Sequence, residues 1–236
     1  MTAPTITPSR AVRTDPTGPD SAANRALLAA GVAAGPLFLA TVLIQQATRA
    51  GVDPQTQPMS LLSQGDLGWI QITNFIICGV LALAAALGLR RSLRHTAGGT
   101  WGPAMFACWG FAMIWGGVFL ADPAFGFPEG TPAGAPAEIS WHSALHGAAS
   151  PLMGIALIAA CLVFARRFQR RGQAPAAGGG IAIAVVYAAL TVVAIVLADY
   201  RLMLVAGAVI WIWTTVICLL VIRDLRVGDG REPEGA

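Results

Sequence analysis

The 236-residue chain contains no lysine, and only 11% of its residues are charged. Soluble domains usually carry about 25% charged residues. A chain with 56% hydrophobic residues has too few polar side chains to cover the surface of a soluble fold. This shortage of charge excludes an ordinary soluble domain and favours a membrane protein. The formal net charge of +3 is also no sign of nucleic-acid binding, because the basic residues lie between apolar runs and form no continuous stripe.

Cysteine is scarce and carries no recognisable motif. The four cysteines, at positions 78, 108, 161 and 218, all lie inside apolar runs. Their spacings match no metal or haem motif, and their positions exclude an external disulfide framework. We interpret them as small packing residues.

Long apolar runs dominate the rest of the chain. A membrane-spanning helix needs roughly 20 mostly apolar residues, and the continuous rather than alternating character of the runs favours helices over a barrel. The sequence therefore predicts an all-α fold, a bundle of six transmembrane helices. The expected spans are Ala26–Thr48, Leu67–Leu89, Trp101–Ala121, Trp141–Ala165, Gly179–Ala198 and Leu202–Ile222.

The arginines predict the orientation of these spans. They crowd into alternate gaps between the apolar runs, and the other set of gaps holds only Arg49 and Arg201. Because cytoplasmic loops carry the excess of basic residues, both termini are expected in the cytoplasm. The sequence thus predicts a multi-pass protein of a bacterial plasma membrane, with the lipid bilayer as its first partner.

The two ends of the chain are polar. Residues 1–24 are rich in Pro, Thr, Ser, Ala and Asp, which predicts a disordered cytoplasmic tail. The transmembrane domain is expected over residues 25–224, and residues 225–236 are expected to form a flexible cytoplasmic tail. No gap is suited to a folded soluble domain, so any chemistry should occur in the membrane or at its outer surface.

Polar side chains cluster near the outer ends of the predicted spans, whereas the inner halves have almost none. Such groups are costly to bury in lipid, so a one-sided cluster indicates function. We expect an outward-facing polar pocket that binds a small molecule or a lipid. Its candidate lining residues are Asp66, Gln71, Asn74, Asp122, His142, His146 and Ser150.

The fourth span holds the sharpest pattern. His142 and His146 recur at i and i+4 and lie on one helix face. Two such histidines and Asp122, at the end of the neighbouring span, could ligate a divalent metal such as zinc, whose activated water would hydrolyse a lipid or amide bond. However, the pattern lacks the glutamate of the HExxH protease motif. Ligand or proton binding without catalysis and plain structural packing therefore remain alternatives.

Two further patterns concern helix ends and helix contacts. In the segment Pro58–Trp69, Ser60 is expected to cap a short interfacial helix and Asp66 to cap the second span. This segment is either a lining of the outer vestibule or simply a well-capped helix start. Gly31 and Gly35 form a GxxxG pair, which predicts a close helix contact.

Several stretches of the chain resemble one protein family. The stretch Ser60–Arg91 resembles the second-span signature of the domain of unknown function 998 family, as found in actinobacterial membrane proteins. The stretches Gly116–Gly134 and Ser140–Gly147 are similar to the third-to-fourth span region of the same family. The resemblance extends from about residue 26 to 222. It implies a six-helix integral membrane protein and no established reaction, substrate or cofactor.

The sequence as a whole favours a binding role over catalysis. The first hypothesis is an integral membrane protein with an outward-facing polar pocket for a small molecule or lipid. The alternatives are a metal-dependent membrane hydrolase that uses His142, His146 and Asp122, and a structural or partner-binding bundle. No pattern in the chain indicates its oligomeric state.

Overall fold

The computed structural model describes residues 19–229, with side-chain environments for residues 22–226. These residues form six α-helices and one short 3-10 helix, and the described part of the chain contains no β-strand, so the all-α prediction is confirmed. The elements are α1 (Pro19–Thr48), η1 (Met59–Ser63), α2 (Gly68–Ser92), α3 (Trp101–Val118), α4 (Trp141–Arg170), α5 (Ala174–Leu197) and α6 (Arg201–Asp229).

Five of the helices are long and apolar enough to cross a membrane, namely α1, α2, α4, α5 and α6. The shortest α-helix is α3, with 18 residues, and glycine, proline and tryptophan interrupt its apolar sequence. It ends at Val118 rather than at the predicted Ala121, because Phe119 adopts an extended conformation (φ −97°, ψ 118°). The helical content therefore supports a multi-pass membrane protein.

The boundaries of the predicted tails differ from the structure. Residues 1–18 and 230–236 of these tails lie outside the described residues. Residues 19–24 belong to α1 and residues 225–229 to α6. Proline suits the first position of a helix, where its missing N–H has no partner to lose, so Pro19 begins α1. At the other end, Leu225 packs against the hydrophobic core and extends α6 beyond the predicted boundary.

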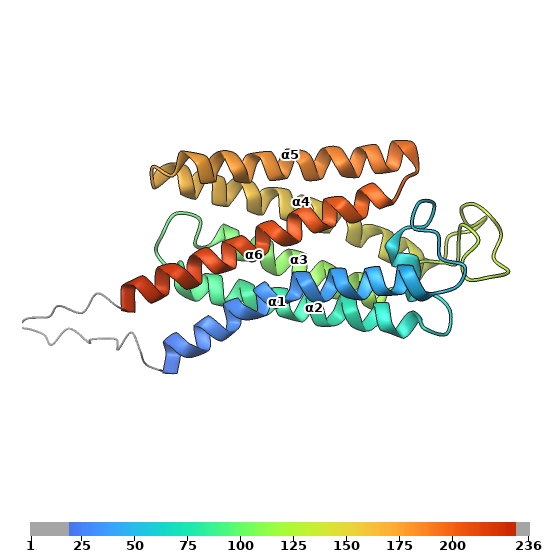
Figure 1. The fold of residues 1–236 in the computed structure, drawn as a ribbon, viewed down its shortest axis with the longest axis horizontal. Coiled ribbons are helices and arrows are strands. Elements are labelled where there is room, and N and C mark those ends of the chain that lie inside the picture. The colour runs from blue at the N-terminus through green and yellow to red at the C-terminus, as the bar shows by residue number, and fades with distance from the viewer. Residues whose placement is uncertain (1–18, 230–236) are drawn as a thin grey trace, which may run out of the picture.

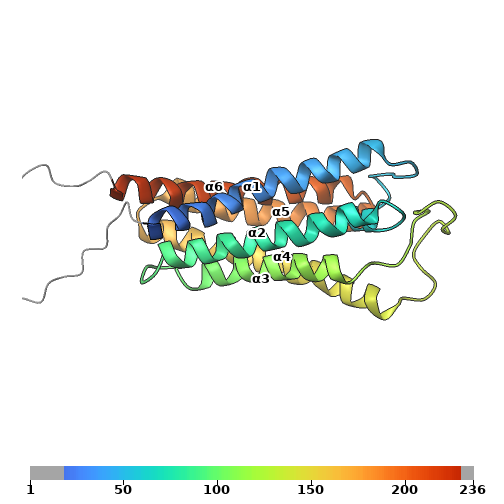
Figure 2. The same ribbon diagram turned by 90° about the horizontal axis from the view of Figure 1, so that it is seen from below.

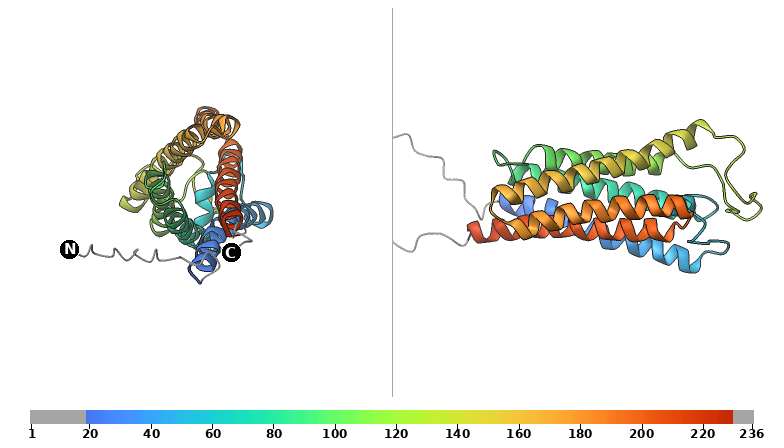
Figure 3. Two further views of the ribbon diagram at one scale, coloured as in Figure 1. Left: turned by 90° about the vertical axis from the view of Figure 1, so that its left-hand side faces the viewer. Right: turned by 90° about the horizontal axis from the view of Figure 1, so that it is seen from above.

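The six helices form a closed ring. Each helix packs against its neighbours in the sequence, and α6 packs against α1 to complete the ring. The end-on view in Figure 3 shows this arrangement, and Figures 1 and 2 show the helices running along the long axis of the molecule. A ring of this kind gives every helix an inward face and an outward face.

The two ends of the ring differ in their loops (Figure 1). At the end that we call the cap end lie the connections 49–67, 119–140 and 198–200. At the opposite end, which we call the arginine end, lie the start of α1, the end of α6 and the connections 93–100 and 171–173. The polar residues singled out in the sequence lie in the cap-end half.

Aromatic side chains fill the ring in its middle and toward the arginine end. The rings of Trp109 and Trp211 lie 4.5 Å apart between their centroids. Beyond them, Phe106, Phe164 and Trp213 contact one another with centroid separations of 5.9–6.0 Å. Aromatic pairs at such separations stabilise a fold by more than the burial of their surface area alone. This cluster leaves the cap-end half of the ring as the place where a cavity can form.

The short segment before α2 forms a helix, but its expected caps are wrong. The residue that precedes η1 is Pro58, and Ser60 lies inside the 3-10 helix. The N-cap of α2 is Leu67, which makes no side-chain capping bond, and Asp66 is exposed in the turn before it. Instead of a cap, close packing defines this turn, because a Cβ on Gly68 would lie 2.2 Å from the Ser63 carbonyl oxygen.

Candidate functional site

A cavity of about 330 Å³ lies inside the cap-end half of the ring. Trp109 and Trp211 of the aromatic cluster form part of its wall, and Pro58 and Met59 at the start of η1 also line it. Apolar side chains provide most of the lining. The polar lining residues are Ser60, His146, Ser150, Tyr187, Thr191 and Tyr200. No aspartate, glutamate or arginine is among its lining residues, so the cavity suits a largely apolar molecule with few hydrogen-bonding groups.

His146 lines the cavity and also bonds the end of α3. Its Nδ1 lies 3.0 Å from the carbonyl oxygen of Gly116 and 2.8 Å from that of Phe119. Because carbonyl oxygens only accept hydrogen bonds, Nδ1 carries the hydrogen, and in a neutral imidazole with this tautomer Nε2 is an acceptor. These carbonyls belong to the last turn of α3, where helices lack internal donors. His146 therefore satisfies the end of α3 while its ring lines the cavity.

Asp122 anchors the loop after α3 to the start of α4. Its carboxylate accepts hydrogen bonds from the Ser140 hydroxyl at 2.6 Å and from the Ser140 backbone N–H at 2.8 Å. Its own backbone N–H donates to the Ser143 hydroxyl at 3.1 Å. Ser140 is the N-cap of α4 and accepts a bond from the Ser143 N–H. The bonds from Ser140 hold the pKa of the Asp122 carboxyl below its ordinary value.

The three predicted metal ligands do not form one site. His142 Nδ1 lies 3.5 Å from the Ser140 hydroxyl, which also bonds Asp122. His142 is exposed, and its ring stacks on Trp141 with centroids 3.8 Å apart. His146 is bound to α3 and Asp122 to Ser140, as described above. Among the residues that the structure describes, no group of three or more His, Cys, Asp or Glu side chains could hold a metal ion. The geometry therefore gives the metal-dependent hydrolase hypothesis no support.

Gln71 and Asn74 lie in the contact between α1 and α2 rather than in the cavity. The Gln45 amide donates to Gln71 Oε1 at 2.8 Å, and Asn74 Nδ2 donates to the Phe38 carbonyl at 3.3 Å. All three polar residues are buried. Buried amides need such partners because water cannot reach them. Of the seven candidate pocket residues, only His146 and Ser150 line the cavity.

Arg49 organises the cap end, although the sequence marked it only as a topology signal. Its guanidinium donates to the carbonyl oxygens of Leu62 at 2.5 Å and Gln64 at 2.6 Å, and lies 5.1 Å from the centre of the Phe127 ring. Another bond, of 3.2 Å, runs to Gln45 Oε1. Partial burial lowers the pKa of this guanidinium. Arg49 thus connects α1, η1 with its C-cap residue Gln64, and the loop before α4 at the cap end.

Sequence reasoning also missed both tyrosines of the cavity. The chain has only two tyrosines, and Tyr187 and Tyr200 both line this space. A tyrosine buried among apolar groups usually needs a partner for its hydroxyl. The sequence shows only that tyrosine occurs twice in the chain, and nothing in it places the two residues together.

A comparison with known proteins identifies the family. The family model described as "Protein of unknown function (DUF998)" matches residues 32–222, from within α1 to within α6, so the chain belongs to this family. No curated protein and no solved structure matches the chain.

Proposed function

We propose that this DUF998 protein crosses a bacterial plasma membrane six times and binds a lipid or another small amphipathic molecule in its cavity. The arginine end and both termini lie in the cytoplasm, and the cap end faces outward. The placement of the arginines supports this orientation, because the cap end carries only Arg49 and Arg201.

The cavity is the observation that carries the proposal. Its volume of about 330 Å³ lies within the range of roughly 300–1,000 Å³ that is typical of ligand pockets. Its mostly apolar lining with a few polar groups is also typical of such pockets. His146 Nε2 can accept a hydrogen bond from a ligand hydroxyl, and Ser150 lines the same wall of α4. An apolar body with one or two hydrogen-bonding groups fits this chemistry.

Binding is favoured over catalysis by what the lining contains. A nucleophilic mechanism needs a hydroxyl or thiol within hydrogen-bond reach of a base. The bonds that the structure gives His146 run to the carbonyl oxygens of Gly116 and Phe119, and none runs to a hydroxyl among the described residues. The imidazole therefore serves as a structural and ligand-binding group.

The cavity can be tested by filling it. Gly207 lines the cavity, and a Cβ at this position would meet nothing within 4 Å. The variant Gly207→Leu should therefore occupy the space without displacing a helix. The probe is a fatty alcohol with a bromine at its far end, which quenches tryptophan fluorescence on contact. Trp109 and Trp211 in the cavity wall should report its binding.

A matched control is Gly178→Leu on α5, where a Cβ would also meet nothing within 4 Å and which does not line the cavity. We expect saturable quenching in the unmodified protein and in Gly178→Leu, and at least a several-fold weaker saturable component in Gly207→Leu. Equal quenching in all three proteins would show that the alcohol does not enter the cavity.

A further inference from the structure

A second hollow lies at the arginine end, on the seam where α6 closes the ring against α1. It has a volume of about 490 Å³ and shares no lining residue with the cap-end cavity. Its apolar floor consists of Ala29, Val32 and Ala33 from α1 and Leu219 and Ile222 from α6. Ala29, Ala33 and Leu219 are exposed, so this seam groove faces away from the ring, toward the surrounding lipid.

Small side chains create the seam groove. On the inner side of α1, Gly31 lets the helices approach so closely that a Cβ there would lie 2.7 Å from Cys218 Sγ of α6. On the outer side, Ala29 and Ala33 are too short to fill the space beside Leu219. The result is an apolar depression between two helices, and its floor of aliphatic side chains suits an acyl chain.

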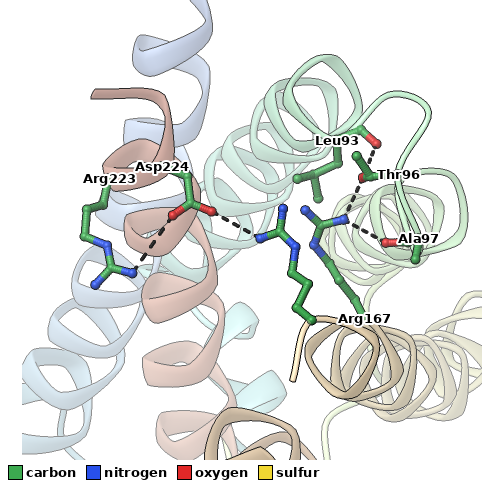
Figure 4. Close-up of polar contacts among 7 residues, drawn as sticks. Leu93, Thr96, Ala97, Arg167, Arg223 and Asp224 are labelled. Carbon is green, nitrogen blue, oxygen red and sulfur yellow. Dashed lines mark hydrogen bonds and ion pairs between the residues drawn. The ribbon is translucent and has the colours of Figure 1, made fainter. Parts of the chain in front are cut away.

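Two arginines of α6, Arg223 and Arg226, form the polar rim of the seam groove. The nearest acid is Asp224, whose carboxylate lies 3.3 Å from Arg171 of α4 but 4.0 Å from Arg223. Figure 4 shows Arg223 and Arg167 on opposite sides of Asp224. Asp224 thus mainly neutralises Arg171.

The rim therefore keeps an excess of positive charge. Asp224 is the only acidic residue at the arginine end among residues 22–226. Within the same residues Arg226 has no ion pair, and the side chains of both rim arginines are exposed. A guanidinium presents several N–H donors in a plane, which matches the oxygens of a phosphate group.

We propose that the seam groove binds an anionic phospholipid from the leaflet around the arginine end. One acyl chain lies on the floor between α1 and α6, and the phosphate contacts Arg223 and Arg226. Basic pockets between transmembrane helices on the cytoplasmic side are suited to such headgroups, and the negative surface potential of that leaflet favours them.

A second copy of the chain fits the seam groove less well than a lipid. A two-fold interface brings the same patch of both copies together, so it would oppose the rim arginines of one copy to those of the other. Like charges at that distance repel, whereas an anionic lipid neutralises them. The positive rim above an apolar floor therefore selects the lipid as the occupant.

The test uses native mass spectrometry of the full chain in detergent, with phosphatidylglycerol or phosphatidylcholine added at equal concentration. We expect the unmodified protein to retain phosphatidylglycerol preferentially. The double variant Arg223→Gln/Arg226→Gln should lose this retention about tenfold. The matched control, Arg166→Gln/Arg170→Gln, removes two exposed arginines from α4 at the same end, and it should keep the retention.

A third variant tests the apolar floor. Ala29→Leu fills the seam groove but leaves its rim arginines in place, so it should also weaken phosphatidylglycerol retention several-fold. The proposal would be overturned if the two double arginine variants lost phosphatidylglycerol retention equally. It would also be overturned if the unmodified protein retained phosphatidylglycerol and phosphatidylcholine equally. Full retention in Ala29→Leu would show that the rim binds a headgroup without the groove. Without added lipid, all variants should have the same melting temperature as the unmodified protein, which shows that they are folded. Lipid retention is compared only among variants that meet this condition.

Discussion

Single polar residues at the cap end hold the loops onto the helix ends. Asp122 is the clearest case, because its carboxylate accepts both bonds from Ser140 at the start of α4. These bonds place the pKa of Asp122 below its ordinary value, which is about 3.9 in an unfolded chain. The ionised carboxylate therefore stabilises the fold at pH values above that of the unfolded group. This stabilisation is lost as the pH falls through the lower pKa of the folded state.

Replacing Asp122 by asparagine should remove this stabilisation. The amide of Asp122→Asn keeps one acceptor oxygen but loses the charge, and the side chain is half-buried, so solvent screens part of the effect. We expect a loss of roughly 0.5–1 kcal/mol in the free energy of unfolding at pH 7. We also expect a flatter loss of stability as the pH falls below about 5. Thermal unfolding in detergent, followed by circular dichroism at several pH values, measures both.

The control for this prediction is Glu129→Gln, which neutralises an exposed carboxylate in the same loop. It should leave the pH dependence unchanged. If Asp122→Asn and the unmodified protein lose stability with the same slope below pH 5, Asp122 is not the group responsible.

For single residues, the sequence predicted the end of the bundle at which they lie better than it predicted their hydrogen-bond partners. His146 and Asp122 do lie at the cap end, as their positions in the chain indicated. Their partners, the last carbonyls of α3 and the N-cap Ser140, depend on where α3 ends and how its loop returns. A helix end shifted by three residues changes both partners, and no sequence pattern fixed that end.

Glycines set the contacts between pairs of helices. The predicted close contact at Gly31 and Gly35 is confirmed, since a Cβ at Gly31 would lie 2.7 Å from Ala85 Cβ. The contact between α2 and α3 depends on Gly79 and Gly110, which face each other. A Cβ on Gly79 would lie 2.7 Å from the Gly110 carbonyl oxygen, and a Cβ on Gly110 would lie 2.8 Å from that of Gly79. No motif could reveal this pair, because its members belong to different helices.

The substitution Gly79→Ala should therefore separate α2 from α3. The new methyl group meets the Gly110 carbonyl oxygen and the Ile114 side chain, each at 2.7 Å, and the backbone contact cannot be relieved by a rotamer change, so the helices must shift. We expect a cost of about 1–3 kcal/mol in the free energy of unfolding, measured by thermal unfolding in detergent. The matched control is Gly178→Ala, where a Cβ meets open space and higher helix propensity should leave stability equal or slightly raised. Similar melting temperatures for both variants would contradict the assigned contact.

The whole molecule combines a ring of helices with two chemically different ends. Apolar runs predicted the helices, and the arginine pattern distinguished the two ends. The closure of the ring by α6 on α1 was beyond the sequence, because six similar apolar helices can pack in several orders. The cavity follows from that closure, since residues from all six helices line it.

The crossing by α3 decides the topology. Its 18 residues extend roughly 27 Å at about 1.5 Å per residue. That is close to the hydrocarbon thickness of about 30 Å. If α3 crosses, the loops on its two sides lie on opposite faces of the membrane, as the proposed six-span topology requires. If it does not, those loops share one face, and the six-span topology is wrong.

The most direct measurement is therefore cysteine labelling of intact cells on the two sides of α3. His95→Cys lies in the loop before α3 and Glu129→Cys in the loop after it, and both positions are exposed. The unmodified chain, whose four cysteines lie within helices, is the control. A membrane-impermeant maleimide should label position 129 in intact cells, and position 95 only after the cells are opened. Labelling of both positions, or of neither, in intact cells would contradict the six-span bundle.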